Sequence, residues 1–326
     1  MKALSLEKGG TLEGFRIIEK SIPQIKDDEL LVKVHAVGLN PSDYQTAEYY
    51  PENISGIVLG LDVSGVVEAV GPCVKNFKIG DRVFFLRQIN NPNGGFAEFA
   101  TTPAILATKI PENINYIDAA TLPGAGFTAY HILFERFNVK SGKTIFIQGG
   151  AGGLGSYAIQ LSKHLGLKVI TTCLGRDIEY VKKLGADIAI DYMNEDVYGI
   201  LKRETDNFGP HYIISSIGPQ GATRDLEALR FGGELAVTAG LPDFSTWEFY
   251  KKGISVHEVA FGEYLTSSNK EDNIRVATIG EKLSELLAQS HISKPHVTLT
   301  SLENIPEWLG KIKRGEVFGK VVALTS

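Results

Sequence analysis

Residues 144–165 read TIFIQGGAGGLGSYAIQLSKHL: an apolar run rich in β-branched and aromatic residues, then a glycine cluster, then an amphipathic segment. The run 144–148 has the composition of a buried strand. Apolar residues then recur at helical spacing, which predicts a helix over 156–165. A strand, a glycine turn and a helix in this order are typical of a parallel sheet with helical crossovers.

Strand and helix patterns alternate beyond this stretch. The strand candidates are Lys168–Thr172, Ile188–Ile190, Tyr212–Ser216, Gly233–Thr238 and Ile254–Phe261, and the helix candidates are Asp177–Leu184, Val197–Glu204 and Gly221–Arg230. This alternation predicts a parallel, doubly wound sheet. We therefore expect an α/β domain over residues 119–262.

Residues 1–118 show a different pattern, in which short apolar runs such as Leu30–Val37 are broken by Gly, Pro and Asn. Such runs indicate strands joined by close turns. Residues 263–326 contain an amphipathic helix pattern over Ile274–Gln289 and lie outside the six strands of a doubly wound domain. We assign 1–118 plus 263–326 to one discontinuous, mostly β domain.

Composition excludes several classes of protein. The formal net charge is −5 and no long run of Lys or Arg occurs, which argues against a nucleic-acid partner. Only Cys73 and Cys173 are present, so neither a disulfide framework nor a multi-cysteine zinc lobe is expected. No signal-peptide core and no run of about 18 apolar residues appears, which argues against secretion and membrane insertion. We expect a cytoplasmic protein.

The glycine turn carries the chemistry. Residues 150–155 match G-x-G-x-x-G between a strand and a helix, the context in which that motif binds dinucleotides. The glycines let the backbone approach a pyrophosphate, and the amides and dipole of the helix start attract the anion. The candidate cofactor-binding residues here are Gly150, Ala151, Gly152, Gly153 and Leu154. The alternative is a glycine-rich turn that binds nothing.

The end of the second strand indicates which dinucleotide binds. Sites that prefer NAD place an acid about 20 residues beyond the glycines to hold the ribose 2′-hydroxyl. Here Thr172 ends the strand and the first charged residue is Arg176, whose guanidinium suits a 2′-phosphate. We therefore expect NADP(H), with Tyr192 beside its adenine or phosphate. Alternatively Arg176 points to water while Asp177 caps the next helix, and Tyr192 is a surface aromatic residue.

Seven segments together resemble the medium-chain dehydrogenase/reductase superfamily, in its zinc-independent quinone oxidoreductase branch. They are GLNPSD at 38–43, GLDVSGVVEAVG at 60–71, GDRV at 80–83, GGFAE at 94–98, LP at 122–123 with TAY at 128–130, the glycine turn, and GKVV at 319–322. The resemblance implies a Rossmann domain inserted in a partly barrel-like, GroES-like catalytic domain. It also implies a homodimer that pairs strands through the sixth strand.

The residues do not favour a metal. Zinc-dependent members of that superfamily carry Cys before the substrate pocket and His-Glu in the second segment, where this chain has Asn40–Asp43 and Leu61–Asp62. Catalytic zinc needs three protein ligands. The histidines are scattered at His35, His131, His164, His211, His257, His291 and His296. We expect no metal site.

The absence of a Lewis acid selects the substrate class. Alcohol oxidation loses its main electrostatic aid, whereas hydride transfer to a quinone or an enone leaves a delocalised anion that hydrogen bonds can stabilise. By resemblance, Asn40 lies near nicotinamide and substrate, Asp43 structures the same loop, and Thr128, Ile217 and Phe261 belong to the nicotinamide pocket. Tyr50 is the candidate proton donor, although relatives tend to have a tyrosine where Gln45 stands.

Each of these assignments has an alternative. For Asn40 the alternative is a turn residue before Pro41. For the tyrosines it is a role in covering the core or the cleft rim, and for Asp62 it is a structural hydrogen-bond acceptor. At the level of function, the alternatives are a non-enzymatic NADPH-binding protein and a zinc-dependent alcohol dehydrogenase.

Overall fold

The computed structural model describes residues 1–245, 247–248, 250–267 and 269–325. The chain forms two compact units. The β unit comprises Met1–Phe127, Gly262–Ser290 and Lys294–Ser326, and the α/β unit comprises Thr128–Phe261 and His291–Ser293. Among the described residues, no helix has the length and apolar character needed to cross a bilayer.

The α/β unit contains a six-stranded sheet in the order β11-β10-β9-β12-β13-β14, with every neighbouring pair parallel. Its strands are β9 (Thr144–Ile147), β10 (Lys168–Cys173), β11 (Ile188–Asp191), β12 (Tyr212–Ser215), β13 (Glu234–Val237) and β14 (Ser255–Glu258). The chain starts in the middle of the sheet, builds one side and then the other, which is the doubly wound order. The predicted doubly wound sheet is confirmed.

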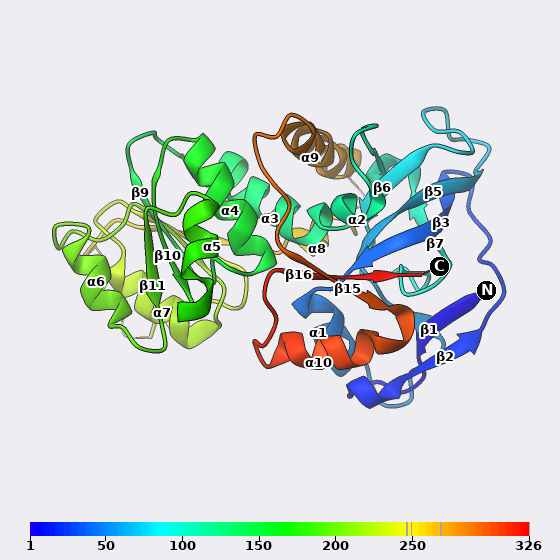
Figure 1. The fold of residues 1–326 in the computed structure, drawn as a ribbon, viewed down its shortest axis with the longest axis horizontal. Helices are drawn as coiled ribbons and strands as arrows, with labels where there is room; N and C mark the ends of the chain where they lie inside the picture. The colour runs from blue at the N-terminus through cyan, green and yellow to red at the C-terminus, as the bar shows by residue number, and fades with distance from the viewer. Residues whose placement is uncertain (246, 249, 268, 326) are drawn as a thin grey trace. The chain divides into compact units, whose positions relative to one another are not determined.

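Helices α4 (Gly153–His164), α5 (Ile178–Lys183), α6 (Val197–Arg203) and α7 (Pro219–Ala228) pack around this sheet (Figure 1). Ile145, Phe146 and Ile147 of β9 are all fully buried. A central parallel strand is covered on both faces, and this is why its sequence is a continuous apolar run instead of an alternating one.

Two expected boundaries in this unit are wrong. Helix α4 begins at Gly153, not at Ser156, because the glycines themselves form the first helical turn after the N-cap Gly152. Strand β14 ends at Glu258, opposite Val237 at the end of its partner β13, so Phe261 lies beyond the strand. Phe261 is instead the first residue of α8 (Phe261–Tyr264).

The β unit contains a seven-stranded sheet in the order β15-β16-β3-β5-β6-β8, with β7 also paired to β3, and a three-stranded sheet β2-β1-β4. The strands are β1 (Lys2–Leu6), β2 (Phe15–Glu19), β3 (Glu29–Gly38), β4 (Ile57–Val58), β5 (Asp62–Val70), β6 (Arg82–Leu86), β7 (Phe99–Pro103), β8 (Thr108–Lys109), β15 (Val297–Ser301) and β16 (Lys320–Leu324). The predicted run Leu30–Val37 lies within β3, which contacts three other strands.

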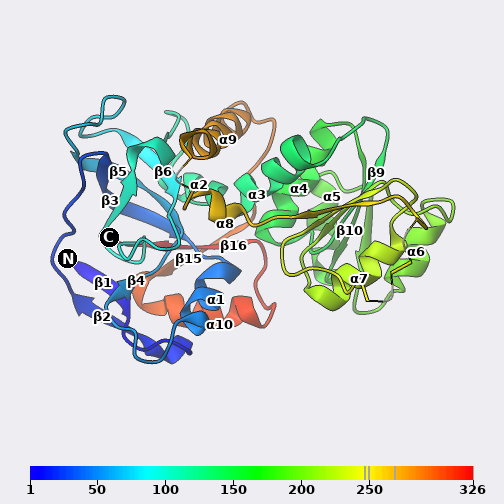
Figure 2. The ribbon, with the colours of Figure 1, turned by 180° about the vertical axis from the view of Figure 1, so that it is seen from behind.

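Helices α1 (Pro41–Tyr49), α2 (Tyr116–Ala119), α9 (Lys270–Ala288) and α10 (Ile305–Lys313) complete the β unit. Figure 2 shows α1 and α10 side by side, and the two helices contact each other. Helix α9 begins four residues before the expected Ile274, because the side chain of Asn269 accepts a hydrogen bond from the Glu271 amide at 3.1 Å and caps the helix there.

The register of the larger sheet brings three distant segments together. Gly38 at the end of β3 pairs with Val322 of β16 on one side and with Asp62 of β5 on the other. A Cβ on Gly38 would lie 2.4 Å from the Ala120 carbonyl oxygen and 2.9 Å from Cε of Lys320. Only glycine allows these segments to approach so closely.

Candidate functional site

The glycine turn at the carboxyl end of β9 is tied to the neighbouring strand. The amide of Gly149 donates to Oγ1 of Thr172 at 3.1 Å, and the amide of Gly150 donates to the Thr172 carbonyl at 2.8 Å. Gly149 has φ of +67°, a conformation that favours glycine. Thr172, predicted as a cofactor-binding residue, therefore shapes the turn from β10.

The glycines of the turn have different roles. A Cβ on Gly150 would lie 2.2 Å from Oγ1 of Thr171, and one on Gly155 would lie 2.3 Å from the Gly149 carbonyl oxygen, so both are needed for packing. A Cβ on Gly152 would meet nothing closer than the Gly149 carbonyl oxygen at 3.4 Å. The fold does not require a glycine at position 152, and the space beside this residue is open.

The start of α4 offers amides to that space. The first main-chain bond of the helix runs from the Ser156 amide to the Gly152 carbonyl at 2.9 Å, so the amides of 153–155 precede the helical ladder. Free amides and a helix dipole attract an anion. The predicted residues 150–154 are therefore gathered into an arrangement that fits a pyrophosphate.

At the end of β10, Cys173 is buried and the first exposed charged side chain is Arg176. Its guanidinium Nε lies 3.7 Å from Oδ1 of Asp177, and the Arg176 side chain is 63% exposed. Asp177 makes no side-chain cap on α5. Burial raises the pKa of Asp177, and the Arg176 charge opposes that rise. An anion near Arg176 would compete with Asp177 for the guanidinium.

Asp191, which the sequence pattern does not single out, ends β11 opposite Cys173. Its Oδ1 accepts from the Met193 amide at 3.1 Å and its Oδ2 accepts from Nδ2 of Asn194 at 2.7 Å. Both oxygens are engaged in its own turn. An acid at the end of the third strand was the available signal.

The other predicted residues of the α/β unit take varied positions. Tyr192 follows β11 and is 48% exposed, and Ile217 follows β12 and is 63% exposed, both at the carboxyl edge of the sheet that carries the glycine turn. Thr128 is half-buried at the start of α3 (Thr128–Tyr130). Phe261 is buried, with its ring centroid 5.2 Å from that of His131.

The β unit contains a buried polar cluster, which we define as Asn40, Asp62 and Lys320. Nζ of Lys320 donates to Oδ1 of Asn40 at 2.7 Å and to Oδ2 of Asp62 at 2.5 Å. Oδ1 of Asp62 accepts from the Gly124 amide at 2.8 Å. The sheet register explains the cluster, because Asn40 and Lys320 each lie two residues beyond the Gly38–Val322 pair.

Two further ionisable residues, Asp43 and Arg87, lie beside this cluster. Asp43 lies in the first turn of α1, and its Oδ2 accepts a hydrogen bond from the backbone N–H of Asn40 at 2.8 Å. Burial raises the pKa of Asp43 to about 7. The guanidinium of Arg87 is buried, which lowers its pKa to about 10, against the opposing influence of Asp43 and Tyr50. Tyr50, the expected proton donor, is half-buried at the end of α1.

Lys320 and Arg87 are site residues that the sequence alone does not predict. Lys320 lies in the closing GKVV segment, and Arg87 follows the apolar strand β6. A cation inside or directly after an otherwise apolar strand was the signal available, because such a residue is rarely buried unless it is paired.

The donor set of the cluster does not fit zinc. Among the described residues, no group of three or more His, Cys, Asp and Glu side chains is placed to hold a metal ion. At the places where zinc-dependent proteins carry ligands, the chain has Asn40–Asp43 and Leu61–Asp62. Within these segments, Oδ1 of Asn40 and Oδ2 of Asp62 accept from the ammonium of Lys320, which would repel a metal cation.

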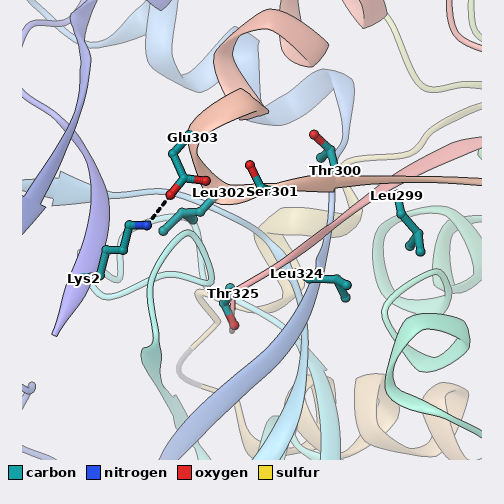
Figure 3. Close-up of a pocket in the computed structure, with 8 residues that line it drawn as sticks. All are labelled: Lys2, Leu299, Thr300, Ser301, Leu302, Glu303, Leu324 and Thr325. Atoms are coloured by element: carbon teal, nitrogen blue, oxygen red, sulfur yellow. Dashed lines mark hydrogen bonds and ion pairs between the residues drawn. The ribbon is translucent and has the colours of Figure 1, made fainter.

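A hollow of about 400 Å³ lies elsewhere in the β unit, at the ends of β15 and β16 (Figure 3). The ion pair between Lys2 and Glu303 borders it, together with Leu299 and Leu324. A second hollow of about 440 Å³ is lined by polar residues that include Gln88 and Asn91. Neither contains a predicted site residue.

Two family models match the chain. Residues 26–112 match the alcohol dehydrogenase GroES-like domain and residues 153–277 match the zinc-binding dehydrogenase family. The chain is 35% identical over 214 residues to a zinc-type alcohol dehydrogenase-like protein of Staphylococcus aureus strain MSSA476, covering 63% of each chain. It therefore spans less than two thirds of the length of that relative.

Two other relatives match over longer regions. The quinone oxidoreductase of Sus scrofa is 31% identical over 280 residues, which is 83% of this chain and 82% of that protein. The 2-methylene-furan-3-one reductase of Solanum lycopersicum is 36% identical over 251 residues, 74% of this chain and 62% of that protein.

Solved structures match along nearly the whole chain. A quinone oxidoreductase of Pseudomonas syringae pv. Tomato DC3000 has a TM-score of 0.89 at 25% identity, covering 99% of both chains. A mycobacterial protein complexed with NADPH has a TM-score of 0.89 at 27% identity, covering 99% of this chain and 100% of that one. The expected α/β domain and GroES-like domain are confirmed.

Proposed function

The chain belongs to the medium-chain dehydrogenase/reductase superfamily, in its quinone oxidoreductase-like branch, and from this premise we propose that it is an NADPH-dependent reductase. Its substrates are quinones or α,β-unsaturated carbonyl compounds, and it uses no metal. The proposal rests on the glycine turn at the end of β9, residues 149–155, which we call the glycine cradle. Arg176 then stands where an NAD-preferring site has an acid.

The residues of each part have separate tasks. We assign the dinucleotide to residues 119–262 and the substrate to residues 1–118 with 263–326. The amides of 153–155 bind the pyrophosphate, Arg176 pairs with the 2′-phosphate, and Tyr192 flanks it. Thr128, Ile217 and Phe261 line the nicotinamide pocket. The bound dinucleotide supplies the hydride.

Metal independence is supported by Lys320. Its ammonium occupies the space between Asn40 and Asp62 and neutralises the carboxylate that a metal would need as a ligand. Without a Lewis acid, hydrogen-bond donors must stabilise the negative charge that develops on the substrate. Reduction of a quinone or an enone spreads this charge over a conjugated system, so donors such as the Asn40 amide suffice. Water or Tyr50 then provides the proton.

Steady-state oxidation of NADPH with a panel of ortho-quinones and alkenals tests the proposal, with NADH as the matched cofactor. We expect turnover on at least one class, faster with NADPH. Tight NADPH binding without turnover on any substrate would favour the non-enzymatic alternative. Stoichiometric zinc in the purified protein, together with alcohol oxidation, would restore the alcohol dehydrogenase alternative.

We also propose a cytoplasmic homodimer. Among the described strands, β14 lies at the end of the six-stranded sheet and pairs only with β13, which leaves one edge for a second copy. Cys73 and Cys173 are both free, as a reducing compartment requires. Light scattering on the purified protein tests the dimer, and a monomer at micromolar concentration would contradict it.

A further inference from the structure

Lys320 sets the orientation of the side-chain amide of Asn40. Its ammonium carries three donors and no acceptor, so the oxygen of the Asn40 amide must face it. The opposite orientation would place the amide NH2 against the ammonium at the same distance. The Lys320 and Asp62 side chains are only 2% and 0% exposed, so water does not weaken this constraint.

The other end of the same amide has no acceptor. Asn40 is only 8% exposed, and its Nδ2 is buried. This atom makes no hydrogen bond with any described residue. An unsatisfied buried donor costs about 1–3 kcal/mol. A ligand oxygen that accepted from this NH2 would recover that cost. The NH2 is therefore a ready donor for a ligand.

The surrounding backbone holds this donor in place. The Leu39 amide donates to the Val321 carbonyl at 2.9 Å, which ties the segment before Asn40 to the strand that carries Lys320. A Cβ on Gly124 would lie 3.0 Å from Oδ1 of Asn40 and 2.8 Å from Oδ1 of Asp62. The cluster is thus preorganised, as an oxyanion-stabilising group must be.

From this arrangement we infer that Lys320 is a positioning residue for the reduction: its ammonium orients and polarises the Asn40 amide, whose NH2 donates to the substrate oxygen. This rests on the proposed function. A cation on the amide oxygen draws electron density from the nitrogen, and hydrogen bonds in a chain strengthen one another. The stronger donor stabilises a developing oxyanion more than a neutral carbonyl, so the effect falls on kcat.

The test removes the charge of Lys320 without leaving the Asp62 carboxylate buried and unpaired. Lys320→Met/Asp62→Asn deletes both charges, and Lys320→Gln/Asp62→Asn retains a neutral donor to Asn40. The matched control is Lys2→Met/Glu303→Gln, which removes a lysine–carboxylate ion pair at the surface of the same unit. Both cluster variants should lose about tenfold or more in kcat, with KM and NADPH affinity little changed, and the control should lose nothing.

A double-mutant cycle separates positioning from general damage. Asn40→Ala should lower kcat, and adding Lys320→Met/Asp62→Asn should cost no more, because Lys320 acts through Asn40. The inference would be overturned if the combined variant lost the product of the separate losses in kcat. It would also be overturned if a folded cluster variant kept the wild-type kcat.

Binding provides a readout that does not need turnover. The probe is 4-nitrophenolate, an oxyanion, titrated by calorimetry in the presence of NADP⁺. Loss of about tenfold in its affinity in the cluster variants, but not in the surface control, supports the role of Lys320 even if the wild type reduces no substrate. Equal affinities in all variants would refute that role, whereas absence of wild-type turnover refutes only the proposed function.

Discussion

Nζ of Lys320 lies 2.5 Å from Oδ2 of Asp62, and both side chains are almost completely buried. The pair joins β16 to β5, which are not neighbours in the sheet but both flank β3. In a buried ion pair, removal of one partner leaves the other charge buried and uncompensated, which destabilises the fold.

Loss of Lys320 alone should destabilise the protein strongly. Lys320→Met leaves the Asp62 carboxylate buried without its cation, which costs about 3–5 kcal/mol. The pair Lys2–Glu303 provides the contrast: its side chains are 41% and 46% exposed, so Lys2→Met should lower the free energy of unfolding far less than Lys320→Met does. Urea unfolding measures both variants, and similar losses in the two would contradict the prediction.

Asp43 should make stability depend on pH. Burial raises its pKa from 3.8 to about 7, with Asp62 adding to the rise and Arg87 and Lys320 opposing it. Between these values the folded protein keeps a proton that the unfolded chain loses. The contribution of Asp43 to the free energy of unfolding is therefore fully present below about pH 4. It decreases as pH rises through about 7, by on the order of 4 kcal/mol in total.

Asp43→Asn should flatten that decline, because the amide keeps an oxygen for the Asn40 N–H but does not titrate. Urea unfolding at about pH 5 and pH 8 measures the difference. Asp225→Asn provides the comparison: burial raises the pKa of Asp225 only to about 6, so this variant should remove a smaller loss of stability than Asp43→Asn does. An unchanged pH dependence in Asp43→Asn would show that this carboxyl does not carry the effect.

The glycines of the cradle should separate folding from binding. Gly150→Ala forces a Cβ against Thr171 and should lower the melting temperature. Gly152→Ala meets only ordinary contacts and should remain folded, yet its methyl group would occupy the space for the pyrophosphate. We expect near-normal melting with NADPH affinity reduced at least tenfold, measured by fluorescence titration. Normal affinity in Gly152→Ala would place the pyrophosphate elsewhere.

Arg176 and Asp177 should have opposite effects on cofactor choice. Arg176→Ala should weaken NADPH by about tenfold or more and NADH little, because hydrogen bonds to a charged group contribute about 1.5–3 kcal/mol. Asp177→Asn removes the carboxylate 3.7 Å from the guanidinium and should increase the preference for NADPH. Dissociation constants for both cofactors decide this, and equal loss of both in Arg176→Ala would rule out a phosphate contact.

Removal of metal should have no effect on activity. The space between Asn40 and Asp62 already contains an ammonium, which supplies the positive charge there. NADPH oxidation rates before and after dialysis against a chelator, and after addition of Zn²⁺, should agree. A loss that Zn²⁺ restores would show that a metal takes part.

The parts of the fold that could be predicted are those encoded by contiguous residues. One strand, one turn and one helix follow each other from residue 144 to residue 164. The composition and the spacing of apolar residues in each segment predict its secondary structure. The helix start was misplaced because the glycines, poor helix formers, are helical only where the turn requires them. The end of β14 was misplaced because its partner strand, not its own sequence, ends the pairing.

Residues close together along the chain encode the doubly wound sheet and the glycine turn, and they place Arg176 after the second strand of that sheet. The cluster of Asn40, Asp62 and Lys320, in contrast, forms only when the chain is folded. The two bonds of Lys320 span 280 and 258 residues, and no local pattern records them. The register of β16, β3 and β5 brings these residues together, and burial there turns three ordinary polar side chains into an oriented donor with a paired charge behind it.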